Sequence, residues 1–253
     1  MVYDLQKADI WKRIAAWLLD FMLATVLVVG CSVLLSSLLN YDSYSQSWSA
    51  ACERYEAKYG IVFDITKEAY DGFSDEEMTN YDAAYQELIA DEEAVYAYNM
   101  MVNLTMLIAT LSILITIALL EFVVPLLFKN GQTLGKKMFS LCVVRKDCVK
   151  VNNLQMFTRA ILGKFTIETM IPAYIIMMLF LGTANILGLA IIAGLFIGQC
   201  ICLAVTRNNS AIHDLMAGTV VVDMPSQMIF DTEQDLIDYQ KKIHAEQAAR
   251  QDY

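Results

Sequence analysis

Long apolar stretches separated by polar segments dominate the pattern of this sequence. The four stretches are Ile14–Leu39, Met101–Phe128, Ile161–Leu181 and Ile186–Val205. A helix rises ~1.5 Å per residue, so about 20 apolar residues are enough to cross the hydrocarbon core of a bilayer. The pattern predicts an all-α membrane protein with four transmembrane helices, a small cytoplasmic β-hairpin element and a helical extracytoplasmic insertion.

The polar segments and the apolar stretches together predict seven parts of the chain. In chain order we expect an N-terminus and first transmembrane helix (1–39), an acidic helical extracytoplasmic insertion (40–100), a second transmembrane helix (101–128), a basic cytoplasmic loop with short strands (129–164), third and fourth transmembrane helices (161–206), a cytoplasmic His-Asp segment and strand (207–225), and a polar cytoplasmic tail (226–253).

Local signals refine the insertion. Ser74 and Glu77 have the spacing of a capping box, and apolar residues then recur at helical spacing. We expect a helix that starts near Ser74 and runs into the second span, and a shorter helix over Ser47–Tyr59. The acidic residues do not have the spacing of an EF-hand loop, and a solvated cap over the spans is the simpler interpretation.

Alternating positions predict short strands in the basic loop and near the end of the chain. Met138–Arg145 alternates, turns at Asp147-Cys148 and returns at Val149–Val151. Thr219–Asp223 has strand composition and could pair with Met138–Arg145. In the fourth span a small residue recurs every fourth position, which favours close packing on a neighbouring helix, with a dimer face as the alternative; the members are Ala190, Gly194, Gly198 and Cys202.

Composition and charge support the membrane interpretation. The chain is 57% hydrophobic with a mean hydropathy of +0.44. Residues 40–100 hold 14 acids and three bases, whereas residues 129–164 hold eight bases and one acid. By the positive-inside rule the basic loop and both termini are cytoplasmic. The bases flank membrane segments, which argues against nucleic-acid binding and for a lipid bilayer as the main partner.

The cysteines and histidines do not indicate a cofactor or an enzyme. The six cysteines are spread over apolar segments and both loops, without a disulfide framework or zinc spacing. His213-Asp214 invites comparison with metal-dependent phosphohydrolases, but those need several more histidines and aspartates. We expect no enzyme activity, no metal and no cofactor.

Charged residues inside the apolar stretches are the candidates for function. Arg13 and Asp20 are seven residues apart and share one face of the first span. Glu121 lies near the inner end of the second span, as a buried functional acid or an interfacial residue. In the third span Lys164 and Glu168 are four apart and could neutralise each other. A carboxylate inside a membrane helix needs a partner or a purpose.

The loop between the second and third spans carries Gly131-Gln-Thr-Leu-Gly135-Lys136-Lys137. Two glycines beside two lysines could suggest phosphate binding, but the Walker spacing is absent. After this loop Asn152–Lys164 is amphipathic, and its Arg159 would face lipid phosphates or protein.

These motifs, in this order, resemble the RDD family of bacterial membrane proteins, which is named for an arginine and two aspartates. The matching positions are Arg13, Asp20 and Asp214, with further motif positions at Arg159, His213, Gly131, Gly135 and Gly218. The resemblance covers residues 7–39 and about 100–223 and implies a multi-pass protein of the bacterial cell (inner) membrane. Family members usually have Asp-Gly at the turn where this chain has Asp147-Cys148, and they lack the acidic insertion.

The resemblance and the charges leave several functions open. Family members are generally taken to be transport-related, so the first hypothesis is transport of a cation, a proton or a small solute through Asp20, Glu121 and Glu168, which would favour a homo-oligomer. Against it stands a purely structural network of Arg13, Asp20 and Asp214. The alternative function is a non-transporting, membrane-anchored interaction or scaffold protein whose acidic extracytoplasmic segment binds a protein partner.

Overall fold

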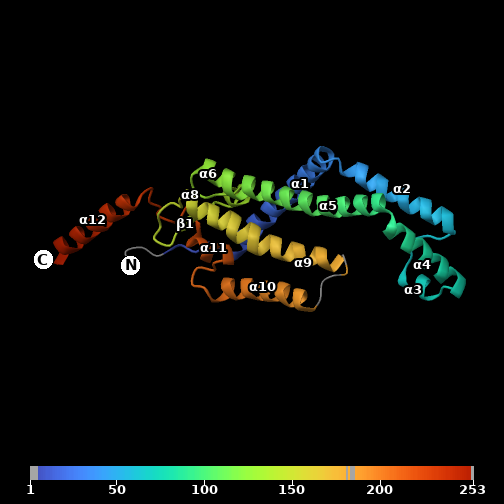
Figure 1. Cartoon of the computed structure of the whole chain (residues 1–253). Helices are drawn as coiled ribbons and strands as arrows, with labels where there is room; N and C mark the ends of the chain where they lie inside the picture. Colours follow the sequence, from blue (N-terminus) through green and yellow to red (C-terminus); the bar gives the residue numbers. More distant parts are fainter. Residues whose placement is uncertain (1–4, 181, 183–185, 252–253) are drawn as a thin grey trace. The chain divides into compact units, whose positions relative to one another are not determined.

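Four helices of the computed structural model, which describes residues 5–180, 182 and 186–251, are long and apolar enough to cross a membrane. The first is α1 (Ile10–Leu38) and the fourth is α10 (Ile186–Val205). The second comprises α5 (Glu92–Ile117), η1 (Ala118–Val123) and α6 (Val124–Phe128), and the third comprises α8 (Asn153–Phe157), η2 (Thr158–Met170) and α9 (Ile171–Phe180) (Figure 1). The prediction of an all-α membrane protein with four spans is confirmed.

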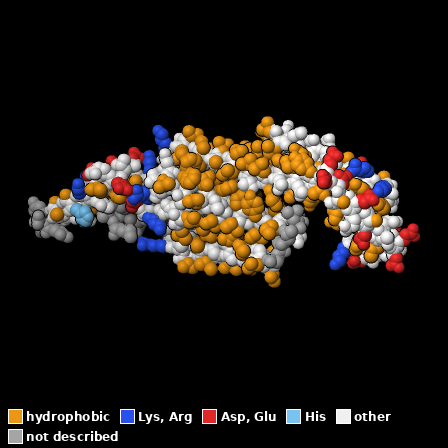
Figure 2. All heavy atoms as spheres, viewed as in Figure 1, with side chains coloured by type: hydrophobic (Ala, Val, Ile, Leu, Met, Phe, Trp, Pro, Cys, Tyr) orange, Lys and Arg blue, Asp and Glu red, His pale blue; other side chains and the backbone are white. Residues whose placement is uncertain are grey.

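The spans bury few of their own apolar side chains inside the chain. Ile186 of α10 is 85% exposed and Val26 of α1 is 71% exposed, and α10 has no buried residue. In Figure 2 the visible face over the spans of the larger unit is mostly hydrophobic, with Lys and Arg gathered at one end. Large exposed apolar surface of this kind is stable in lipid and not in water.

Compact packing divides the chain into two units. The larger unit is Met1–Val28 with Ile113–Tyr253, and the smaller unit is Val29–Ser112, so the boundaries fall within α1 and α5. The larger unit contains every charged residue that the sequence singled out as a candidate. The smaller unit contains the acidic segment.

Two stretches of the spans are π-helical. In η1 and η2 the backbone hydrogen bonds skip one residue more than in an α-helix; Val124 N–H donates to the Leu119 carbonyl and Ile171 N–H to the Thr166 carbonyl. Isolated π turns are frequent at functional sites, and η2 extends over 13 residues. The amino-acid pattern predicts helix here, and it does not distinguish α from π.

A two-stranded antiparallel sheet joins distant parts of the larger unit. β1 (Leu141–Arg145) pairs with β2 (Thr219–Asp223), with Val143 opposite Val221. The predicted pairing is thus confirmed. The expected return of the chain after Asp147-Cys148 consists of an isolated bridge between Val144 and Lys150 and a 2.9 Å bond from Arg145 N to the Val149 carbonyl.

The sheet is covered on both faces. Leu141, Val143 and Val221 pack with Ala16 of α1, while Cys142, Val144, Val220 and Val222 form a second cluster. Cys148 has φ 66°, the left-handed conformation that favours glycine. The family's usual Asp-Gly turn would place glycine there, whereas here a buried cysteine packs with Val149 and Phe230.

Two short helices connect the sheet to the spans. α7 (Leu134–Met138) starts after Thr133, whose hydroxyl accepts a hydrogen bond from Lys136 N at 3.3 Å. α11 (Ile212–Ala217) ends at Gly218, which has φ 67° and donates its N–H to the helix carbonyls. Gly218 is therefore a left-handed helix cap, as its position before a strand requires.

The C-terminal segment contacts the sheet region. Phe230 is buried against Cys148 and Val149, and Leu236 and Tyr239 of α12 (Glu233–Gln251) pack beside it. Asp231 pairs with Lys150 at 2.5 Å. The start of the predicted polar tail is therefore part of the packed structure.

The smaller unit holds α2 (Tyr41–Tyr59), α3 (Lys67–Asp71) and α4 (Asp75–Ala90). The predicted capping box at Ser74 and Glu77 is present. The predicted continuous helix is wrong: α4 ends at Ala90, and the extended backbone of Asp91 (ψ 105°) separates it from α5. The Asp91 carboxylate accepts hydrogen bonds from Glu93 N and Ala94 N and so starts the next helix.

The expected packing of the small-residue positions in the fourth span is not found among the described residues. A Cβ atom added at Gly194 or Gly198 would meet nothing within 4 Å. α9 and α10 are in contact, but not through these glycines. Residues 183–185, between the third and fourth spans, lie outside the described residues.

A buried charge network as the candidate functional site

Among the described residues of the larger unit, eight charged side chains form ion pairs in which both partners are shielded from solvent. None has a side chain more than 22% exposed; they are Arg13, Asp20, Glu121, Lys136, Arg159, Lys164, Glu168 and Asp214. Four are acids and four are bases, so the set has no net formal charge. Because an unpaired buried charge is costly, this balance allows the set to be buried at all.

Asp20 is held by the loop that follows the second span. Its carboxylate accepts hydrogen bonds from Thr133 Oγ1 at 2.5 Å and from Gly135 N at 2.7 Å. The ammonium of Lys136 lies 3.8 Å from Asp20 Oδ2. Of the expected network of Arg13, Asp20 and Asp214, the pair between Arg13 and Asp214 is present, whereas Asp20 bonds to the loop and to Lys136. The glycine–lysine loop binds an anion, and that anion is the chain's own carboxylate.

Gly135 makes this contact possible. A Cβ atom at this position would lie 2.2 Å from the Ala16 carbonyl oxygen and 2.9 Å from Asp20 Cγ. Any side chain would push α7 away from α1 and lengthen the bonds to Asp20. The motif glycine is thus explained by a close approach of two backbones.

Lys136 lies between two carboxylates. Its Nζ is 3.8 Å from Asp20 Oδ2, 3.8 Å from Glu121 Oε2 and 3.1 Å from Thr133 Oγ1. Burial is the largest influence on this group and lowers its pKa from the ordinary 10.5 to about 8; Glu121 and Asp20 oppose the shift, and Lys164 and Arg159 add to it. Lys136 is therefore a buried base whose pKa of about 8 lets it lose its proton at a lower pH than an ordinary lysine.

Glu121 is buried, and its second partner comes from the third span. Lys164 donates a hydrogen bond to Glu121 Oε1, and both lie in the π-helical stretches. Lys164 thus forms its ion pair with Glu121 rather than with Glu168 as expected, while its charge still acts on Glu168. The expectation used i,i+4 geometry, which holds for an α-helix, whereas η2 repeats at i,i+5.

A second group of charges surrounds Asp214, whose side chain is fully buried. Arg159 donates to Asp214 Oδ1, and Arg13 Nη2 lies 3.4 Å from Asp214 Oδ2. Burial alone would raise the pKa of the Asp214 carboxyl, but the neighbouring guanidinium groups, Arg159 most strongly, hold it well below its usual range. Arg159 is only 2% exposed, so it faces protein rather than lipid phosphates.

His213 connects Arg159 to the fourth acid. Its Nδ1 lies 2.9 Å from Glu168 Oε1, and its Nε2 lies 3.2 Å from Arg159 Nη2. Burial lowers the pKa of His213, Asp214 opposes that shift and Arg159 adds to it. A neutral ring that donates from Nδ1 to Glu168 and accepts at Nε2 from Arg159 satisfies both contacts.

Some of the site was not recognised in the sequence. Gly163 allows η2 to approach α11, because a Cβ atom there would lie 2.5 Å from His213 Cβ. Thr133 and Thr219 bond Asp20 and Arg159 through their hydroxyls. A hydroxyl or a glycine next to a charged motif is a weak signal, and only the fold shows which ones contact it.

The remaining motif glycine, Gly131, supports the loop rather than the charges. It has φ 61°, and an added Cβ atom would lie 2.9 Å from Val143 Cβ. Among the described residues, no group of three or more His, Cys, Asp and Glu is arranged to hold a metal ion.

Comparison with known proteins agrees with this arrangement of motifs. The model of the RDD family matches residues 7–218, which include all eight charged residues and the acidic segment. No match is found among curated proteins or among solved structures. The match covers most of the chain, and the four apolar helices agree with it, so this chain is a membrane protein that belongs to the RDD family.

Proposed function

We propose that the chain exchanges a monovalent cation for a proton across the membrane, with Asp20, Glu121 and Lys136 as the exchange centre. The observation that carries this proposal is the position of the Lys136 ammonium, 3.8 Å from a carboxylate oxygen of each acid and almost fully buried. Protonated Lys136 balances these carboxylates together with Lys164. Neutral Lys136 leaves one negative charge uncompensated, which attracts a cation.

Exchange follows if the proton and the cation compete for this one charge. To keep the centre electrically neutral, one proton is released for each monovalent cation bound. Because the pKa of Lys136 is lowered to about 8, cation binding should rise as pH increases through 8. Of the three candidate transport acids, Asp20 and Glu121 belong to the exchange centre, whereas Glu168 is bonded to His213. We place the basic end of the spans in the cytoplasm of a bacterial cell, by the positive-inside rule.

The test is ion exchange in proteoliposomes that contain the purified full chain. A sodium or potassium gradient is imposed, and the internal pH is followed by a dye between pH 6.5 and 9.5. We expect proton movement driven by the cation, with a midpoint near pH 8. Lys136→Arg keeps the positive charge at every pH, because arginine stays protonated, so it should fold and lose exchange.

Controls separate folding from function. Lys137→Arg changes the neighbouring exposed lysine and should exchange like the wild type. Asp20→Asn should lose exchange while eluting normally on size exclusion. A well-folded wild type that moves neither protons nor cations would refute the proposal, as would full exchange by Lys136→Arg.

A second function has its own observation. The acidic segment folds around buried Ala51, Leu88 and Ala94 rather than forming a loose connection. Tyr85 of α4 is 48% exposed, and Val62, between α2 and α3, is 57% exposed. A non-transporting, membrane-anchored interaction protein would use this surface, placed outside the cytoplasm, to bind a protein. Removal of the exposed aromatic ring by Tyr85→Ser should abolish such binding and leave ion exchange unchanged.

A further inference from the structure

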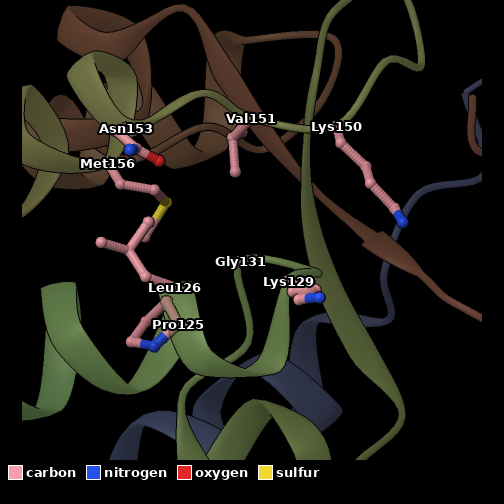
Figure 3. A pocket seen from close by; sticks show the side chains of 8 residues that line it. All are labelled: Pro125, Leu126, Lys129, Gly131, Lys150, Val151, Asn153 and Met156. Atoms are coloured by element: carbon pink, nitrogen blue, oxygen red, sulfur yellow. The ribbon is translucent and has the colours of Figure 1, made fainter. Parts of the chain in front are cut away.

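A small pocket lies where the second and third spans meet the basic loop. It has a volume of about 190 Å³ and is lined by Pro125, Leu126, Lys129, Gly131, Lys150, Val151, Asn153 and Met156. In Figure 3 Leu126 and Pro125 of α6 lie opposite Met156 of α8, and Lys129 lies at the other side. None of these residues belongs to the buried charge network.

The lining has an apolar and a cationic part. Pro125 and Met156 are buried and form the apolar wall with Leu126. Lys129 is exposed, and no ion pair of its ammonium occurs among the described residues. Lys150 is held at the rim by Asp231 at 2.5 Å. A ligand for this lining needs an anionic group next to an apolar one.

The pocket is also placed at the level of a membrane surface. It lies at the last turn of the second span and the first turn of the third. The residues beside it in the chain, Leu127 and Leu154, are 72% and 71% exposed. Exposed leucines together with the exposed Lys129 at the end of a span match the boundary between acyl chains and headgroups.

We propose that this pocket binds the headgroup of an anionic phospholipid. Lys129 contacts the phosphate, and the wall of Pro125, Leu126 and Met156 contacts the adjoining part of an acyl chain. Pockets for whole small molecules usually measure ~300–1,000 Å³, so this smaller one is suited to part of a lipid whose remainder stays in the bilayer. Basic pockets between spans are known to take anionic headgroups. The Asp231 carboxylate competes with the lipid for Lys150.

The experiment counts lipids bound to the purified full chain by native mass spectrometry. The detergent-solubilised protein is titrated with phosphatidylglycerol, with phosphatidylcholine and with inorganic phosphate. We expect phosphatidylglycerol to bind and the other two to bind at least tenfold more weakly. Lys129→Gln should weaken phosphatidylglycerol about fivefold, the change that one basic residue near an anionic surface contributes. Asp231→Asn should tighten it.

The matched control is Lys146→Gln, an exposed lysine of the same basic segment that does not line the pocket. It should change binding less than twofold. Equal weakening by Lys129→Gln and Lys146→Gln would mean a general surface charge and would overturn the site. If phosphatidylcholine bound equally well, the pocket would have no preference for an anionic headgroup. If inorganic phosphate bound tightly, the ligand would be free phosphate and not a lipid.

Discussion

The two units of this protein use the same kinds of ion pair in opposite surroundings. In the larger unit the side chains of Arg159 and Asp214 are 2% and 0% exposed. In the smaller unit those of Lys58 and Glu87 are 53% and 43% exposed. Water already solvates the second pair, so forming it gains little. The first pair is desolvated, so removing either charge leaves the other buried and uncompensated.

The buried charges of the larger unit specify the fold, whereas the exposed charges of the smaller unit keep that segment solvated. The buried set is balanced, four acids against four bases, and involves distant parts of the chain. The acidic segment has 14 acids against three bases, an imbalance that only a solvated surface tolerates. Its acidic side chains are visible over α2–α4 in Figure 2.

The largest effect should come from Arg159→Leu. Asp214 would remain fully buried with Arg13 at 3.4 Å as its remaining guanidinium partner, and we expect a loss of about 3–5 kcal/mol in the free energy of unfolding. Denaturant unfolding in detergent measures it. In the double variant Arg159→Leu/Asp214→Leu, which removes both charges, part of the loss should return. Wild-type stability of the single variant would show that the pair is not the support described.

Gly135→Ala should have the next largest effect. The added methyl group would lie 2.2 Å from the Ala16 carbonyl oxygen, and we expect a loss of about 1–3 kcal/mol. Gly194→Ala is the matched control, because its added Cβ atom meets nothing within 4 Å. In that helix it should gain up to about 1 kcal/mol from the better helix propensity of alanine. Thermal unfolding midpoints compare the two, and equal midpoints would contradict the close approach.

The smallest effect should come from Glu87→Gln in the acidic segment. The pKa of Glu87 is lowered by hydrogen bonds from Lys58 and Tyr59, yet its side chain is 43% exposed to solvent. We expect the unfolding midpoint to stay within about 2 °C of the wild type. Raising the salt concentration should shrink even this difference, because surface charges are screened. A shift as large as that of Arg159→Leu would erase the contrast between the units.

What the sequence predicts best is what depends on neighbouring residues. The apolar stretches give four spans, Ser74 and Glu77 give a capped helix start, and the alternation of Thr219–Asp223 gives a strand that pairs as expected. Each of these signals is contained within one segment. The family is also predicted from the order of the motifs, and its model matches residues 7–218.

The partners of the charges could not be predicted, because they depend on how segments far apart in the chain approach each other. Asp20 pairs with a loop more than 100 residues away, reached only because Gly135 lacks a side chain. Lys164 bonds to Glu121 rather than to Glu168, four residues on, because η2 is a π-helix and not an α-helix. No local sequence pattern predicts that the Gly135 loop contacts Asp20, or that η2 is a π-helix.

The separation of Arg159 and Asp214 along the chain has a consequence for biosynthesis. Arg159 enters the third span, and its counter-ion follows 55 residues later, after the fourth span. At ~5–20 residues per second the ribosome needs roughly 3–11 seconds to supply it. During that interval the arginine must be accommodated by lipid headgroups, by water or by the insertion machinery. The final contact of the network therefore closes only after both last spans have been made, and a nascent chain stalled before Asp214 should be a substrate for membrane quality control.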